Sequence, residues 1–215
     1  MPPHLKILAP HEYRVQELTA PGQEPVELAA IKTHLRISDT VQDDELATLL
    51  QTARVLCESY AGKVLVTRTL ALFLDRWPLD TNVVWWDGVR EGAALQDNLA
   101  VRLPVAPVQA IEAIYLHDVA GGARTIAPTD YAFDALGARL SLADTGFADL
   151  RTMNAIEIRI VAGYGDASAV PLVYKQAIRQ LTAYLYANRG DGGDSALARC
   201  GAAALLAPFR EVSLR

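Results

Sequence analysis

The sequence predicts an α+β protein: helices near both ends form one bundle, and an antiparallel β unit is inserted between them. Apolar residues recur at three- and four-residue steps within residues 25–63, as they do along one face of a helix. They alternate singly over parts of residues 64–163 and return to the helical period over residues 170–207. Neither helical portion can bury its apolar stripe alone, so we expect the two portions to pack together.

Prolines and a glycine punctuate residues 1–24, which we expect to form an extended N-terminal arm. The segment "PVELAAIKTHLRIS" then predicts a first helix. Pro25 is expected in its first turn, where the missing N–H does no harm. This helix opens the first part of the helical bundle, residues 25–63.

The clearest predicted helix covers residues 42–61. Its apolar stripe is formed by Leu46, Leu49, Leu50, Ala53, Leu56 and Tyr60. Asp43, Asp44 and Glu45 lie in its first turn, where the helix dipole favours negative charge, and Gly62 follows as a stop signal. A metal site would need further carboxylates converging from elsewhere, whereas helix capping explains the acidic cluster without them.

The middle of the chain, residues 64–163, predicts an antiparallel β unit. In "NAIEIRIVAGYG" the isoleucines alternate with charged residues, as in a half-buried strand. Gly121 and Gly137 indicate hairpin turns. Pro104 and Pro107 indicate a sheet edge or a break, because proline cannot donate to a ladder of backbone hydrogen bonds.

Helical periodicity returns after Pro171, which begins the second part of the bundle, residues 170–207. Its predicted buried stripe consists of Tyr174, Ala177, Ile178, Leu181 and Leu185. "GDGGD" then predicts a flexible link, and "SALARCGAAALLAP" a last short helix that ends at Pro208. Residues 208–215 are left as a C-terminal tail that mixes apolar and basic side chains.

Composition and charge narrow the functional classes. The net charge of −5 argues against a general nucleic-acid binder, and the helices carry no basic recognition stripe. We expect Cys57 and Cys200 to be reduced core residues, since two thiols do not make a disulfide framework. The sequence has no secretory signal pattern and no apolar stretch long enough to span a bilayer, so we expect a soluble protein made in the cytoplasm, without membrane contact.

A search for catalytic chemistry yields no catalytic, cofactor-binding or metal-binding residue. The four histidines are scattered and lack the short spacing to cysteines or carboxylates that zinc sites show. The sequence contains no Gly-x-Ser-x-Gly elbow, phosphate loop or dinucleotide fingerprint. We therefore expect no enzyme, while a ligand-binding protein or enzyme built on the β unit stays open as the alternative.

Several segments together resemble the head-to-tail connector, or adaptor, proteins of long-tailed bacteriophages and of gene transfer agents. They are "PVELAAIKTHLRI", "DDELATLLQTARVLCESYAGK", "IRIVAGYG" with Pro171 after it, "AIRQLTAYLYANRG" and "LLAPFR". In that family a helix ends in Leu-Tyr-x-x-Arg, and a glycine-rich link leads to Leu-Leu-x-Pro-Tyr/Phe-Arg. The resemblance covers roughly residues 25–66 and 156–210, and the β insertion matches it only in general character.

The resemblance implies a structural protein at the head–tail junction of a virion or gene transfer agent particle. Members form a ring, usually a dodecamer, beneath the portal protein, and join it to the stopper or tail-terminator protein below. DNA would pass through the lumen without sequence-specific binding. The negative charge of the chain is consistent with such a conduit, because a basic lumen would hold the DNA.

Two sets of site residues follow. The resemblance implies that the C-terminal segment reaches the portal, through Pro208, Phe209, Arg210, Val212, Leu214 and Arg215. A head-to-tail ring needs two different matching surfaces on each copy. Candidates are the acidic face of helix 42–61 and the basic face of helix 171–189, with Asp43, Asp44, Glu45, Lys175, Arg179 and Arg189. Ordinary solvation is the alternative role of these charges.

Overall fold

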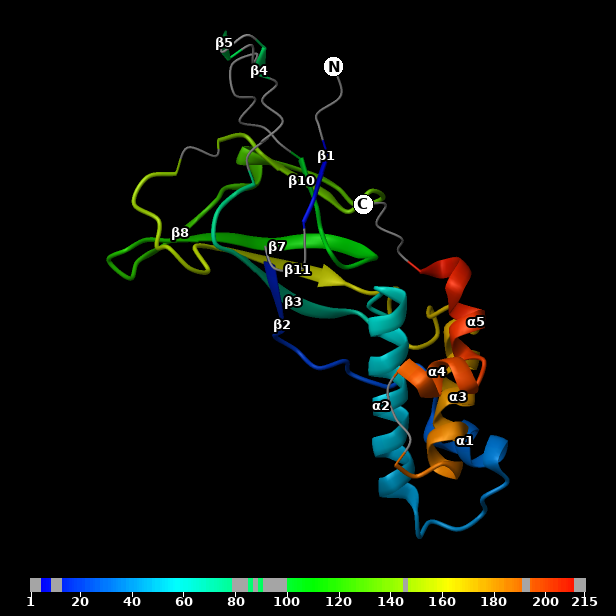
Figure 1. Ribbon diagram of the computed structural model, residues 1–215. Helices are drawn as coiled ribbons and strands as arrows, with labels where there is room; N and C mark the ends of the chain where they lie inside the picture. The colour runs from blue at the N-terminus through cyan, green and yellow to red at the C-terminus, as the bar shows by residue number, and fades with distance from the viewer. Residues whose placement is uncertain are drawn as a thin grey trace. The chain divides into compact units, whose positions relative to one another are not determined.

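The structure is a computed structural model that describes residues 5–8, 13–78, 85–86, 89–90, 100–144, 147–190 and 194–210. The chain packs into two compact units. The β unit comprises Met1–Ala20 and Thr69–Ala162, and the helical unit comprises Pro21–Arg68 and Gly163–Arg215 (Figure 1). Helices from both sides of the β segment thus share one unit, and the predicted α+β class is confirmed.

The larger sheet of the β unit has five strands in the order β2-β3-β11-β7-β8 (Figure 1). They are β2 (Tyr13–Glu17), β3 (Arg68–Leu74), β11 (Ile156–Ala162), β7 (Val108–His117) and β8 (Ala123–Thr125). The pairs β2–β3, β11–β7 and β7–β8 are antiparallel. Ile156, Ile158 and Ile160 are buried, as their alternation predicted.

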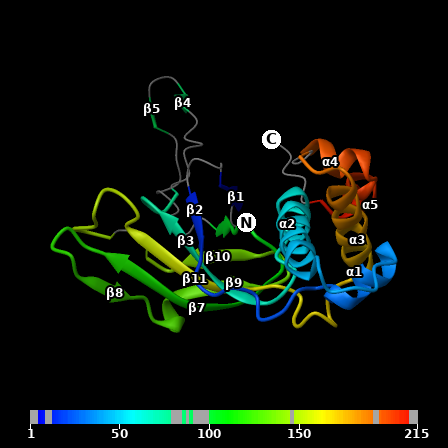
Figure 2. The same cartoon turned by 90° about the horizontal axis from the view of Figure 1, so that it is seen from below.

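A second sheet has four strands in the order β1-β6-β10-β9. These are β1 (Leu5–Ile7), β6 (Ala100–Arg102), β10 (Arg139–Leu142) and β9 (Tyr131–Asp134), the last preceded by a 3-10 turn at Pro128–Asp130. The strands β4 (Trp85–Trp86) and β5 (Val89–Arg90) pair with each other (Figure 2). Val101, Leu140 and Leu142 supply buried side chains from the second sheet.

The predicted N-terminal arm contributes two of these strands. β1 pairs in parallel with β6, and β2 pairs with β3 from Tyr13 opposite Leu74 to Glu17 opposite Leu70. The extended backbone of the arm is therefore satisfied by sheet hydrogen bonds. The predicted turn at Gly121 lies between β7 and β8, with a φ of 87° that suits glycine, and Pro107 lies in the break before β7.

The helical unit contains α1 (Leu28–Leu35), α2 (Asp43–Ala61), α3 (Leu172–Ala187), α4 (Asp194–Arg199), α5 (Ala202–Leu206) and a final 3-10 turn, Ala207–Phe209. α2 and α3 lie side by side and pack through their apolar stripes (Figures 1 and 2). All five predicted stripe residues of α3 are buried, whereas Leu49, Leu56 and Tyr60 of α2 are only partly buried at the rim of the core. None of the described helices is both long and apolar enough to cross a membrane.

Three local expectations need correction. α1 begins at Leu28, after Pro25, because Glu27 has extended backbone angles and serves as its N-cap. The predicted last helix is split into α4 and α5 by Gly201, whose φ of 79° lies in the left-handed region that interrupts a helix. Cys200 lies at this break and is half-buried, not a full core residue.

Cys57, by contrast, is fully buried in α2, as expected. Both cysteines are free thiols. Burial, with smaller contributions from Cys200 and Glu58, raises the pKa of the Cys57 thiol to about 12. Cys57 therefore acts as an inert packing residue, because the thiolate is the reactive form.

Candidate functional site

The first candidate surface is the end of the helical unit, where the C-terminal segment leaves α5. Pro208 and Phe209 form the 3-10 turn that follows this helix. The centroid of the Phe209 ring lies 6.0 Å from that of Tyr174, whose ring is in turn 5.8 Å from Tyr164. Tyr174 is buried, whereas Phe209 remains 46% exposed. Phe209 therefore packs on α3 with one side of its ring and leaves part of its surface exposed.

Arg210 is also held on the helical unit. Its guanidinium carbon lies 5.2 Å from the centroid of the Tyr60 ring, a cation–π contact with the end of α2. The described part of the predicted portal-binding set, residues 208–210, is thus anchored to its own chain. Val212, Leu214 and Arg215 lie outside the described residues.

The six predicted interface charges divide into two groups. Lys32 pairs with Asp43 at 2.7 Å, and Arg189 pairs with Glu45 at 3.3 Å, both within this chain. The Nζ of Lys175 donates to the carbonyl oxygen of Ser168 at 3.4 Å.

Asp44 and Arg179 differ from the other four. Within the described part of the chain, neither side chain has a hydrogen-bond or ion-pair partner. The Nε atom of Arg179 is buried and has no acceptor. The predicted interface therefore contains one acidic and one basic side chain that the described residues leave unpaired.

A buried ion network that the sequence analysis missed joins three segments of the helical unit. Oε2 of Glu58 accepts from Nη1 of Arg54 at 2.9 Å and from Nη2 of Arg68 at 2.8 Å. Its Oε1 accepts from the backbone N–H of Leu65 at 2.8 Å and from Nη1 of Arg68 at 2.9 Å. Nε of Arg54 donates to Glu24 at 2.9 Å. The sequence signal was Arg54 and Glu58 at i, i+4 beside the apolar stripe of α2.

The network ties α2 to the chain segments before and after it within the helical unit. Arg54 and Glu58 are each 7% exposed, so their charges are largely withdrawn from water. Glu58 is tied to Leu65 and Arg68, which lead out of α2 toward the strands. The network positions α2 and the chain on either side of it.

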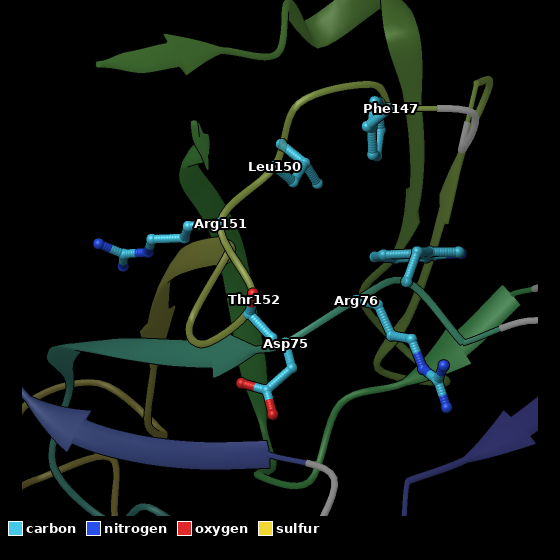
Figure 3. Close-up of a pocket in the computed structure, with 7 residues that line it drawn as sticks. Asp75, Arg76, Phe147, Leu150, Arg151 and Thr152 are labelled. Carbon is cyan, nitrogen blue, oxygen red and sulfur yellow. The ribbon is translucent and has the colours of Figure 1, made fainter. Parts of the chain in front are cut away.

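The alternative ligand site would lie in the β unit, where a cavity of about 560 Å³ is present (Figure 3). Its lining consists of Asp75, Arg76, Trp77, Phe147, Leu150, Arg151 and Thr152. Asp75 and Arg151 are engaged with the backbone of Asn154, at 2.8 and 2.9 Å. Figure 3 shows Arg76 and Arg151 extending in different directions, so their charges do not converge on one ligand.

Three titratable groups that the structure describes in the β unit are engaged with one another away from the cavity. Glu157 is buried on β11, where Nε2 of His117 lies 3.0 Å from Oε2 and Nε of Arg159 lies 2.7 Å from Oε1. Burial acts to raise the pKa of Glu157, but the hydrogen bonds from Arg159 and His117 outweigh it and hold the pKa below its ordinary value. None of these three residues lines the cavity of Figure 3. Among the described residues, no group of three or more histidines, cysteines or carboxylates could hold a metal ion.

The ion pair between Glu157 and Arg159 predicts that the stability of the fold depends on pH. We expect Arg159→Gln to lower the free energy of unfolding at pH 7 by about 0.5 kcal/mol, because the pair is partly exposed and screened. The pKa of Glu157 is depressed in the folded state, so its stabilisation is present above the ordinary carboxyl pKa and is lost as pH falls through the folded value. Urea unfolding at neutral pH and at about pH 3 should show the difference shrinking. Arg14→Gln on β2 is the control, and an Arg159 effect of equal size at both pH values contradicts the assignment.

The structure thus defines an α+β chain in which a helical unit, ending in the half-exposed Phe209, is interrupted in the sequence by a β unit with a five-stranded and a four-stranded sheet and the β4–β5 pair. No protein-family model and no curated protein matches it. Among solved structures, it is similar to a chain in the neck of an empty gene transfer agent (GTA) particle with C6 symmetry. The TM-score is 0.70 at 25% identity, over 94% of this chain and 97% of that chain.

Two further structures of GTA particles give the same result. A chain in the neck of the native particle, with C12 symmetry, matches with a TM-score of 0.66 at 26% identity. A chain in the virion of the native particle matches with a TM-score of 0.65 at 25% identity. Both matches cover 94% of this chain and 97% of the other. This extent includes the β unit as well as the helices, so the chain shares the whole architecture of a GTA particle neck chain.

Proposed function

We propose that this chain is a structural component of the neck of a gene transfer agent or related phage particle. There, copies of it form a ring beneath the portal protein and join the capsid to the stopper or tail-terminator protein. The observation that carries the proposal is the likeness to GTA neck chains over 94% of this chain and 97% of that chain. The resemblance of its helical segments to head-to-tail connectors supports the same role.

A ring of twelve copies is the assembly that fits these particles best. The similar neck structures have C12 symmetry in one case and C6 symmetry in the other, and a twelve-membered ring satisfies both. The lumen of such a ring serves as part of the DNA conduit. A net charge of −5 favours passage over retention, since phosphate binding depends on basic side chains.

The C-terminal segment is the portal anchor in this proposal. Phe209 packs against Tyr174 and is 46% exposed as a residue, so its exposed area is already oriented. Arg210 is fixed on Tyr60 in the same way. A pre-ordered aromatic contact loses less conformational entropy on binding than a free one. Residues 211–215 add the apolar and basic side chains beyond this point.

Binding to purified portal rings from the same genome, viewed by electron microscopy, tests the proposal. The full chain is compared with a chain cut after Arg210 and a chain cut after Ala207. The first cut keeps the contacts of Phe209 and Arg210 with the helical unit, whereas the second removes them. We expect the full chain to add a ring of density, and either cut to weaken binding at least about tenfold.

Each outcome has a distinct meaning. If both shortened chains bind as well as the full chain, the connector role stands but the portal anchor lies elsewhere. If only the chain cut after Ala207 fails to bind, and the thermal unfolding midpoint of that chain also falls, then residues 211–215 are dispensable for binding. Failure of the full chain to bind portal rings would refute portal docking itself.

A further inference from the structure

We infer that, in the assembled ring, Arg179 of one copy pairs with Asp44 of the next copy, across a contact between the exposed sides of α3 and α2. This inference rests on the proposed function, because it names the surface through which the ring closes. It commits to a second copy of this chain as the occupant. The evidence lies in the two helix faces and in one charge on each of them that has no partner among the described residues.

The α3 side of the contact carries an unsatisfied cation. Leu172 is 80% exposed at the start of the helix, and Arg179 lies two turns further along the same side. Nε of Arg179 is buried without an acceptor, and the described residues supply no partner to its guanidinium. A guanidinium remains charged at any physiological pH, so a partly covered arginine without an acceptor is costly. An incoming carboxylate would remove that cost.

The α2 side offers a matching surface with one carboxylate. Asp44, Thr48 and Val55 follow one another along its exposed side, and Val55 is 52% exposed. The hydroxyls of Thr48 and Thr52 donate back to their own helix, to the carbonyl oxygens of Asp44 and Thr48, both at 2.9 Å. These hydroxyl hydrogens are therefore already used within the helix. On this exposed side of α2, Asp44 supplies a carboxylate that has no partner among the described residues.

The exposed sides of α2 and α3 are placed so that copies of the chain can join head to tail into a ring. α2 and α3 lie side by side (Figure 2) and pack against each other through their buried stripes. Their exposed sides therefore face away from this contact. Each copy then presents the Asp44 surface to one neighbour and the Arg179 surface to the other. A heterologous contact of this kind repeats until the rotation closes a ring.

Cysteine cross-linking tests the contact in assembled particles. The variant carrying both Asp44→Cys and Arg179→Cys should, under mild oxidation, form a ladder of covalent oligomers from the dimer upward. Asp44→Cys alone and Arg179→Cys alone should form no oligomers, because in a heterologous contact neither residue meets its own copy. Cys57 and Cys200 are present in every variant and provide the background. Dimers from either single variant would overturn the inference.

Charge exchange tests the pairing. Asp44→Arg alone and Arg179→Asp alone should each lower incorporation into necks about tenfold, since each places like charges opposite one another. The two substitutions together should restore incorporation. Glu27→Arg and Arg36→Asp, at the N-cap and C-cap of α1, are matched controls, expected to leave incorporation unchanged. Loss in both single variants without rescue in the double variant would overturn the pairing.

The tests separate this inference from the proposed function. If the unmodified chain is absent from purified necks, the proposed function fails. If it is present, but the double cysteine variant gives no ladder, the connector role stands and the α2–α3 contact is wrong.

Discussion

Replacing Glu58 with alanine is expected to lower the free energy of unfolding by about 4 kcal/mol. The Glu58 carboxylate neutralises Arg54 and Arg68, and all three side chains are about nine-tenths buried. Its removal leaves two guanidinium groups partly withdrawn from water without their acceptor, and also leaves the backbone N–H of Leu65 unsatisfied. Urea unfolding of the full chain, followed by circular dichroism, measures the change.

Glu24→Ala is the matched control for this prediction. Glu24 also accepts from Arg54, but it makes that one contact at the edge of the network and is more exposed than Glu58. We expect this variant to lose about 1 kcal/mol, the cost typical of one charged hydrogen bond at a partly exposed site. Equal losses in Glu24→Ala and Glu58→Ala would show that Glu58 is not the centre of the network.

Replacing Gly163 with alanine is expected to cost about 3 kcal/mol of stability. Gly163 has a φ of 132°, a backbone conformation that residues with a side chain rarely adopt. A Cβ at this position would lie 2.5 Å from both N and Cα of Thr67. That backbone cannot move freely, because the next residue, Tyr164, donates to Leu65 at 3.0 Å and Thr67 donates to Gly165 at 2.8 Å. Chemical denaturation of the full chain checks the value.

Gly22→Ala provides the comparison, since a Cβ on Gly22 would meet no atom within 4 Å and its φ is ordinary. We expect a change within about 0.5 kcal/mol of zero there. The Gly163 variant should also reach necks in lower amounts, because the strand-like pairing beside it helps to hold the helical unit together. A Gly163→Ala variant whose urea unfolding midpoint equals that of the wild type would contradict this account.

The elements with strong periodicity were predictable from the sequence. The stripe of α3, from Tyr174 to Leu185, and the alternation of Ile156, Ile158 and Ile160 on β11 are buried as expected. Such patterns are readable because a helix and a strand each repeat side-chain directions at a fixed local period. The start of α1 and the break at Gly201 were less predictable, since both depend on single backbone angles rather than on a period.

The charged residues illustrate what local pattern cannot supply. The acidic first turn of α2 was visible in the sequence, but its partners were not. Arg189 meets Glu45 across a separation of 144 residues, and Lys32 meets Asp43 from α1. These contacts arise only when α1, α2 and α3 have packed, because residues remote in the chain share no periodic signal.

By itself, the sequence determined the α+β class, the buried faces of the main helices and the absence of a recognisable catalytic motif, all of which follow from side-chain type and spacing. Tertiary structure decided which charged side chains pair within the described part of the chain and which do not. It placed Phe209 half-exposed on Tyr174, buried Glu58 between two arginines, and left Asp44 and Arg179 without partners among the described residues. The physical reason is that pairing depends on distance in space, which chain packing sets.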